Sequence, residues 1–129
     1  TVLSGASDLS GGTYTNNTTT YSDVISYSYT PVSSSSYLVI QFICRYYITG
    51  SGGDTWNARI TVDGNEIGYT QERNDARAGP LTPFWVRYTN SSTTAKTIAY
   101  QAARSSSDDT ITFYAGENGC YLRITEIAR

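Results

Sequence analysis

The chain has no histidine, and Lys96 is its only lysine. The absence of histidine removes the usual general base at neutral pH, the imidazole ligands of metal sites, and the nucleophile systems that depend on a histidine partner. A glycosidase needs only two carboxylates, but most of the 11 acidic residues fall in turns, where Asp is favoured for backbone reasons. We therefore expect no enzymatic activity, no metal site and no cofactor. Lys96 sits beside a turn, and we expect it to be solvated.

Charge and long apolar runs are also scarce. Only 16% of the residues are charged, against about 25% in an average soluble protein. The formal net charge is −2 and no basic run occurs, so we expect no nucleic-acid partner. The longest apolar run, residues 37–42, is interrupted by Gln41 and too short to span a bilayer, so we expect no membrane insertion.

The chain lacks methionine and starts at Thr1, and we expect it to be the C-terminal piece of a longer polypeptide.

Cysteine occurs only twice, at Cys44 and Cys120. Two cysteines do not make a disulfide framework in a chain of this size. Cys44 lies inside an apolar strand and Cys120 begins the last one, so the two could bridge if these strands are neighbours. Two buried thiols are the alternative, and the sequence leaves both possibilities open.

What the chain does contain is a series of short alternating strands. Residues 1–20 are rich in Ser, Thr, Gly and Asn, and we expect a polar linker or a loosely packed N-terminal segment there. Residues 21–129 form the expected domain. Its strands are expected at 22–29, 37–48, 56–62, 66–71, 84–88, 96–103, 110–115 and 121–129. The Asp63-Gly64 pair predicts a type I′ hairpin turn.

About eight strands, with turn signals roughly every dozen residues and no helical period, predict an all-β fold. The expected architecture is an antiparallel β-sandwich of the jelly-roll (TNF/C1q-like) type. An immunoglobulin-like sandwich is the rival, but the expected Cys…Trp…Cys spacing is missing.

The stretch 37–48 is apolar on both faces. Leu38, Ile40 and Phe42 lie on one side, and Val39 and Ile43 on the other. Such a strand is either central in a sandwich or covered by a partner subunit on its outer side. This surplus of apolar surface leads us to expect a homotrimer.

Tyrosine dominates the aromatic residues, with twelve Tyr beside two Trp and three Phe. Tyrosine suits recognition surfaces, but it also fills half-buried sheet faces. Alternation indicates that Tyr69, Trp85 and Arg87 are exposed, while Arg73 and Arg77 fall in a polar loop at 72–83. We therefore select Tyr69, Arg73, Arg77 and Trp85 as candidate receptor-binding residues. The alternative is that the two aromatic residues pack against a neighbouring subunit and the arginines are solvated.

Two segments carry a resemblance to a known family. The strand at 121–129 runs to the last residue, with Leu122 and Ile124 facing one way and Arg123 and Thr125 the other. Residues 51–56 form a Gly-rich turn, followed by an alternating strand and the Asp-Gly turn. Over roughly residues 21–129 this pattern resembles the C-terminal receptor-binding jelly-roll domains of bacteriophage tail fibres and tail spikes.

The resemblance implies a non-enzymatic virion attachment module at the distal tip of a fibre. It implies a homotrimer that contacts a saccharide or protein receptor on a bacterial surface. Two alternatives stay open: a trimerisation or capsid-decoration domain without its own receptor, and a carbohydrate-binding module of a secreted enzyme.

Overall fold

The computed structural model describes residues 1–8, 13–49, 55–73, 84–105, 110–114 and 121–129, which form eleven β-strands. Their bounds are β1 Val2–Asp8, β2 Thr13–Asn16, β3 Ser22–Tyr29, β4 Ser36–Ile43, β5 Tyr46–Thr49, β6 Thr55–Val62, β7 Asn65–Arg73, β8 Phe84–Asn90, β9 Lys96–Arg104, β10 Thr110–Tyr114 and β11 Tyr121–Ala128. Every strand pairing is antiparallel. None of the described segments forms a helix long and apolar enough to cross a membrane.

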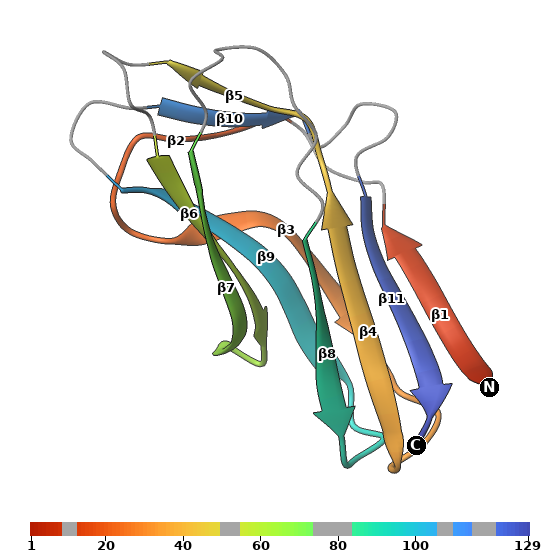
Figure 1. Ribbon diagram of the computed structural model, residues 1–129. Helices are drawn as coiled ribbons and strands as arrows, with labels where there is room; N and C mark the ends of the chain where they lie inside the picture. The colour runs from red at the N-terminus through yellow and green to blue at the C-terminus, as the bar shows by residue number, and fades with distance from the viewer. Residues whose placement is uncertain (9–12, 50–54, 74–83, 106–109, 115–120) are drawn as a thin grey trace.

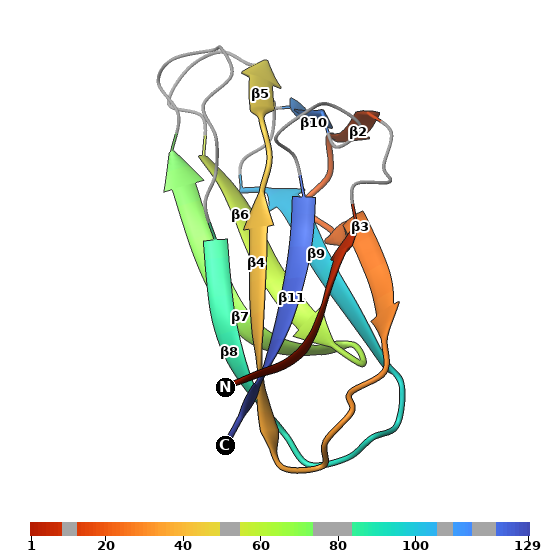
Figure 2. The ribbon, with the colours of Figure 1, turned by 90° about the vertical axis from the view of Figure 1, so that its right-hand side faces the viewer.

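Two four-stranded sheets pack face to face (Figures 1 and 2). The first sheet has the order β1-β11-β4-β8, and the second sheet has the order β3-β9-β6-β7. A capping sheet of three strands, β2-β10-β5, lies across one end, while both chain termini lie at the other end. The antiparallel β-sandwich of jelly-roll type that the sequence predicts is confirmed.

The core lies between the two large sheets and is closed by the capping sheet. Phe42 of β4 and Tyr100 of β9 stack across the sandwich with ring centroids 3.7 Å apart. Phe113 of β10 enters from the capping sheet, 5.4 Å from the Trp56 ring and 5.8 Å from the Tyr100 ring. These four side chains are fully buried. Offset and edge-on aromatic contacts of this kind add to the stabilisation from burial alone.

The expected single strand at 37–48 is wrong, because the chain changes sheets within it. β4 ends at Ile43 in the first sheet, and β5 begins at Tyr46 in the capping sheet. The Tyr46 ring lies 5.0 Å from the Trp56 ring in an edge-on contact, which draws the chain over the end of the core. Part of the apolar surface that suggested a partner subunit is therefore buried within one chain.

The expected N-terminal linker is also corrected. β1 pairs with β11, with Gly5 opposite Thr125, and β2 pairs with β10. Ala6 and Tyr14 from these two strands pack against the core. The segment is poor in apolar residues because β1 and β2 are edge strands that contribute few side chains to the core. These two strands and the division of 37–48 raise the total from about eight to eleven.

The described residues bear on three local expectations, which concern the Asp63-Gly64 turn, Lys96 and the two cysteines. The Asp63-Gly64 turn is confirmed, with φ angles of 51° and 79° that match a type I′ turn. Lys96 is buried rather than solvated, and its Nζ donates a hydrogen bond of 3.2 Å to the Ser92 hydroxyl. Cys44 is buried, but Cys120 lies outside the described residues, so a bridge and two buried thiols both stay open.

Candidate functional site

Tyr69 points out of the second sheet. It pairs with Arg59 of β6, and the neighbours of Arg59 along the strand, Ala58 and Ile60, are fully buried in the core. Because side chains alternate along a strand, Arg59 and its partner Tyr69 face away from the core. The Tyr69 side chain is 51% exposed, as its place in the alternation predicts.

Trp85 points out of the first sheet. It pairs with Gln41 of β4, which lies between the fully buried Ile40 and Phe42. Trp85 is 64% exposed, the highest exposure of any described aromatic side chain in the strands of the two large sheets. Since the inner faces of the two sheets meet in the core, Tyr69 and Trp85 lie on opposite outer faces of the sandwich. The structure does not bring these two predicted site residues together.

The side chains of the other two predicted site residues lie outside the described part of the structure. Arg73 is the last residue of β7, where its backbone pairs with Thr55. Arg77 lies outside the described residues.

The outer face of the first sheet carries two arginines stacked on tyrosines. The guanidinium carbon of Arg87 lies 4.6 Å from the Tyr37 ring centroid, and that of Arg123 lies 4.7 Å from the Tyr121 ring centroid. Together with Trp85 they form what we call the aromatic–arginine face. Among the described residues neither guanidinium forms an ion pair, and no carboxylate is directed outward from the strands of this sheet. The donors on both guanidinium groups are therefore available to a ligand.

Strand register brings these residues into rows. Arg123 of β11 is opposite Gln41 of β4, which is in turn opposite Trp85 of β8. Neighbouring strands are about 4.8 Å apart, so the backbones of Arg123 and Trp85 are separated by roughly 10 Å. Sequence alternation already placed Arg123 on the outer side of its strand. It could not show that Trp85 shares the row, because the pairing of β11, β4 and β8 joins segments far apart in the chain.

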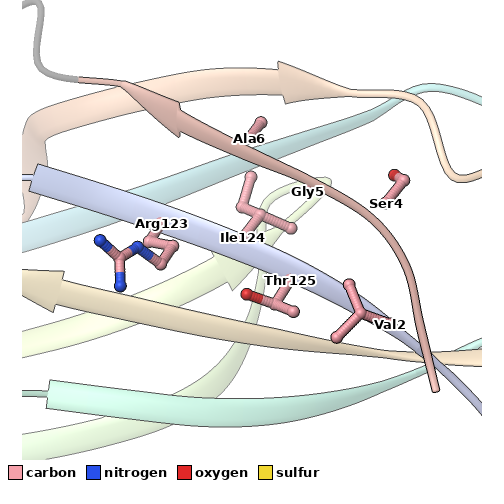
Figure 3. A pocket seen from close by; sticks show the side chains of 7 residues that line it. All are labelled: Val2, Ser4, Gly5, Ala6, Arg123, Ile124 and Thr125. Carbon is pink, nitrogen blue, oxygen red and sulfur yellow. The ribbon is translucent and has the colours of Figure 1, made fainter.

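A hollow of about 240 Å³ lies at the β1–β11 edge of the same sheet (Figure 3). Its lining residues are Val2, Ser4, Gly5, Ala6, Arg123, Ile124 and Thr125. Val2, Arg123 and Thr125 extend to the same side of the two strands. Gly5 is paired with Thr125, and a Cβ atom there would come within 3.0 Å of the Ile124 carbonyl oxygen. The absence of a side chain at Gly5 keeps the hollow open.

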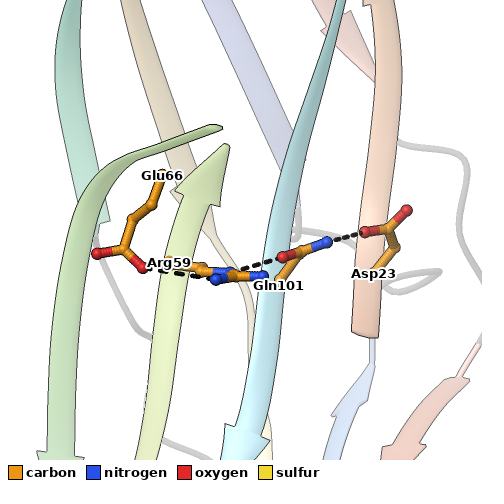
Figure 4. Close-up of polar contacts among 4 residues, drawn as sticks. All are labelled: Asp23, Arg59, Glu66 and Gln101. Carbon is orange, nitrogen blue, oxygen red and sulfur yellow. Dashed lines mark hydrogen bonds and ion pairs between the residues drawn. The ribbon is translucent and has the colours of Figure 1, made fainter. Parts of the chain in front are cut away.

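The outer face of the second sheet has a different character, because its polar groups already bind one another (Figure 4). Gln101 Nε2 donates a hydrogen bond of 2.7 Å to Asp23 Oδ1, and Arg59 Nε donates one of 2.7 Å to the side-chain oxygen Oε1 of Gln101. Arg59 Nη1 lies 3.6 Å from Glu66 Oε2. We call these four residues the polar row. Burial, followed by the nearby Tyr69 and Glu66, raises the pKa of the Tyr21 phenol, whose ring Arg59 covers.

Tyr69 belongs to a similar cluster beside the polar row. Its hydroxyl donates a hydrogen bond of 3.1 Å to Asn57 Oδ1, which also accepts one of 3.0 Å from the Gln71 amide. The polar end of Tyr69 is thus engaged within the sheet. The second sheet offers a ligand fewer unpaired donors than the aromatic–arginine face does.

The one fully buried carboxylate, among the described residues, has a structural role. Glu126 accepts hydrogen bonds from the Tyr29 hydroxyl, the Ser36 hydroxyl and the backbone N–H groups of Val32 and Ser33. Burial by itself would raise the pKa of Glu126, but these four hydrogen bonds outweigh it and hold the pKa below its usual value. Within the described part of the chain no group of three or more acidic or cysteine residues is placed to hold a metal ion.

Comparison with known proteins supports the fold. No family model matches the sequence, and no curated protein matches it significantly. Among solved structures, two chains of infectious bursal disease virus are similar: the Gx strain (TM-score 0.53, 12% identity, 97% of this chain) and the VP2 subviral particle (TM-score 0.51, 11% identity, 98% of this chain). The insecticidal delta-endotoxin Cry8Ea1 of Bacillus thuringiensis is also similar (TM-score 0.51, 10% identity, 91% of this chain).

This chain spans 40% of each viral chain and 19% of the toxin chain. At such low identity the likeness shows a shared all-β sandwich fold and nothing further.

Proposed function

We propose that this chain is a non-enzymatic attachment module of a virion, the distal domain of a phage tail fibre. In this proposal it binds a saccharide on a bacterial surface through the aromatic–arginine face. The observation that carries the proposal is the pair of stacked, unpaired guanidinium groups of Arg87 and Arg123 on the same sheet face as the exposed Trp85.

The chemistry of this face suits a sugar. An exposed indole offers a flat apolar surface on which the C–H face of a sugar ring packs, in the way that aromatic residues serve other recognition surfaces. Guanidinium groups donate several hydrogen bonds in a fixed plane, and stacking on Tyr37 and Tyr121 limits their motion before a ligand arrives. An oligosaccharide lying along the row from Trp85 to Arg123 contacts both ends of it.

The virion assignment rests on two supports. The C-terminal strand and the Asp-Gly hairpin resemble those of phage fibre tips, and the sandwich fold is also found in the two viral chains. By the same resemblance the module acts as a homotrimer, in which several weak sites on one particle raise the avidity without new contacts. A trimerisation or decoration domain without a receptor would bind no saccharide. A carbohydrate-binding module of a secreted enzyme would be joined to a hydrolase domain.

The test compares alanine substitutions on the two outer faces. Trp85→Ala removes the exposed indole of the first sheet, and Tyr69→Ala is its matched control on the second sheet, since both are exposed aromatic residues on edge strands. We expect Trp85→Ala to weaken binding of the chain to immobilised host lipopolysaccharide or capsule by about tenfold, the equivalent of roughly 1.4 kcal/mol. Tyr69→Ala should leave binding unchanged.

Both variants should keep the melting temperature of the unsubstituted chain, because neither side chain belongs to the core. A loss of binding in Tyr69→Ala alone would move the site to the second sheet. No binding of the unsubstituted chain to any host surface saccharide would contradict the proposed function.

A further inference from the structure

The hollow at the β1–β11 edge has a distinct chemistry within the aromatic–arginine face. Arg123 is the only charged residue among those that line it, and Thr125 adds a hydroxyl group on the same side. Its wall at Val2 is apolar, and its floor at Gly5 is bare backbone. A concave site with an apolar wall and a few polar groups is the usual form of a small-ligand site. Its 240 Å³ is less than the roughly 300–1,000 Å³ of pockets for drug-sized ligands, so it suits one small ring.

Among the described residues, none neutralises the charge of Arg123. Its neighbour in sequence on the inner side, Leu122, is buried, and the nearest acidic residue along β11 is Glu126. The Glu126 side chain is directed inward, where four donors hold it. Among the described residues no carboxylate lines the hollow. An anionic ligand group therefore meets an unpaired guanidinium there.

The second arginine of the face does not share this setting. Arg87 has the same stacked geometry on a tyrosine, at 4.6 Å from Tyr37 against 4.7 Å for Arg123 from Tyr121. Arg87 lies on β8, however, at the other edge of the first sheet, and does not line the hollow. The two arginines thus differ in one relevant respect, namely the concave surface beside Arg123.

We infer that the hollow binds an acidic monosaccharide unit of the receptor, whose carboxylate or phosphate group accepts hydrogen bonds from Arg123. The apolar wall at Val2 contacts the sugar ring, and the Thr125 hydroxyl is placed to bond one of its hydroxyl groups. This inference rests on the proposed saccharide binding and names the class of sugar that the site selects. Guanidinium groups bind planar carboxylates and phosphates through paired charge-assisted hydrogen bonds, which are about twice as strong as neutral ones.

Four small probes separate the contributions of the acid and of the ring. They are glucuronate, glucose 6-phosphate, glucose and acetate, each titrated into the isotopically labelled 129-residue chain and followed by two-dimensional NMR. We expect the backbone amides of Gly5 and Thr125 to shift with the two acidic sugars. Both acidic sugars should bind at least tenfold more tightly than glucose or acetate. The stronger of the two identifies a carboxylate or a phosphate as the natural group.

The matched variants are Arg123→Gln and Arg87→Gln. Arg123→Gln should abolish the preference for acidic sugars and reduce glucuronate affinity to that of glucose, whereas Arg87→Gln should keep the preference. The inference would be overturned if both variants lost the preference for acidic sugars equally, or if Arg123→Gln kept that preference. Acetate binding as tightly as glucuronate would also overturn it, because the hollow would then recognise an anion and not a sugar.

The failure of this inference can be told apart from failure of the proposed function. In one outcome, Trp85→Ala weakens binding to host saccharide while Arg123→Gln leaves the preference for acidic sugars unchanged. That result would support the attachment function and refute the assignment of the hollow to an acidic sugar. If neither the probes nor host saccharide bind, both proposals fall.

Discussion

The Tyr29 hydroxyl donates a hydrogen bond of 2.9 Å to the carboxylate of Glu126, although the two residues are 97 positions apart. The same carboxylate accepts a bond of 2.7 Å from the Ser36 hydroxyl, and it holds the backbone N–H groups of Val32 and Ser33 at 2.9 and 3.0 Å. These bonds tie the connection between β3 and β4 to β11. The outer face of β11 carries the arginine of the hollow, so Glu126 supports the proposed site from the inner side of its own strand.

Glu126→Gln should destabilise the chain strongly. The glutamine keeps the size of the side chain, but it loses the charge and directs an amide NH₂ group at donors that need an acceptor. Hydrogen bonds to a buried charged group contribute about 1.5–3 kcal/mol each, and their losses are not additive. We expect the free energy of unfolding to fall by about 2–4 kcal/mol, measured by urea denaturation near neutral pH. Glu66→Gln is the control, because that exposed pair with Arg59 should change stability by less than about 1 kcal/mol.

The stability contributed by Glu126 should disappear in acid. Its pKa is lower in the folded chain than the ordinary value of 4.5, so the unfolded chain binds the proton more readily. The contribution is therefore fully present above about pH 4.5 and is lost as the pH falls through the lower folded value. Urea denaturation across this range should show the difference between the unsubstituted chain and Glu126→Gln narrowing on acidification. A difference that grows toward low pH would contradict a lowered pKa.

The sequence predicted the strands that contribute many core side chains. β6 alternates strictly between polar and apolar residues, and β11 does so from Leu122 to Thr125, and the structure places both strands where the pattern predicts. The inward position of Glu126 departs from this alternation. The exposure of Trp85 and Tyr69 follows from the same alternation. β1 and β2 were missed because their Ser, Thr and Gly residues leave no apolar period to read.

The candidate site was less predictable, because it depends on which strands are neighbours. Trp85 and Arg123 share a row only through Gln41, and this pairing joins three distant segments. The hollow depends on Gly5 pairing with Thr125, in a segment expected to be unpaired. Local patterns report the face of a residue, whereas non-local pairing decides which residues share that face.

Asn16→Ala should destabilise the chain by about 1–3 kcal/mol. The buried Asn16 amide donates hydrogen bonds of 2.9 Å to the Ala102 carbonyl and 3.1 Å to the Thr20 carbonyl, and its oxygen accepts one of 2.7 Å from the Thr18 N–H. Alanine leaves these groups without the partner that joins the β2–β3 connection to β9. Asn17→Ala is the matched control. The Asn17 side chain is exposed, so its removal should change the free energy of unfolding by less than about 0.5 kcal/mol. Equal losses in thermal or urea denaturation would show that Asn16 is not the anchor.

The isolated chain should not hydrolyse bacterial surface polysaccharide. Glycosidase carboxylates stand about 5–9.5 Å apart across the scissile bond. On the outer face of the second sheet, the backbones of Asp23 of β3 and Glu66 of β7 are three strand spacings apart, or roughly 14 Å, and Gln101 and Arg59 fill the space between the two carboxylates. Incubation with host capsule or lipopolysaccharide should release no reducing ends above a heat-denatured blank. Release in proportion to the amount of protein would establish an enzyme and refute this expectation.

The chain should assemble as a homotrimer, with a light-scattering mass about three times its 14.1 kDa at micromolar concentration. The resemblance to fibre tips implies this state. The subunit interface must leave the outer side of β4 open, because that side lies within the aromatic–arginine face, with Gln41 between Arg123 and Trp85. A clean monomer would refute the trimer. Trp85→Ala should keep the trimer mass, because we assign Trp85 to the ligand and not to a neighbouring subunit. If Trp85→Ala instead yields monomers, the aromatic–arginine face is a subunit interface, and a loss of saccharide binding in that variant has an assembly defect as its cause.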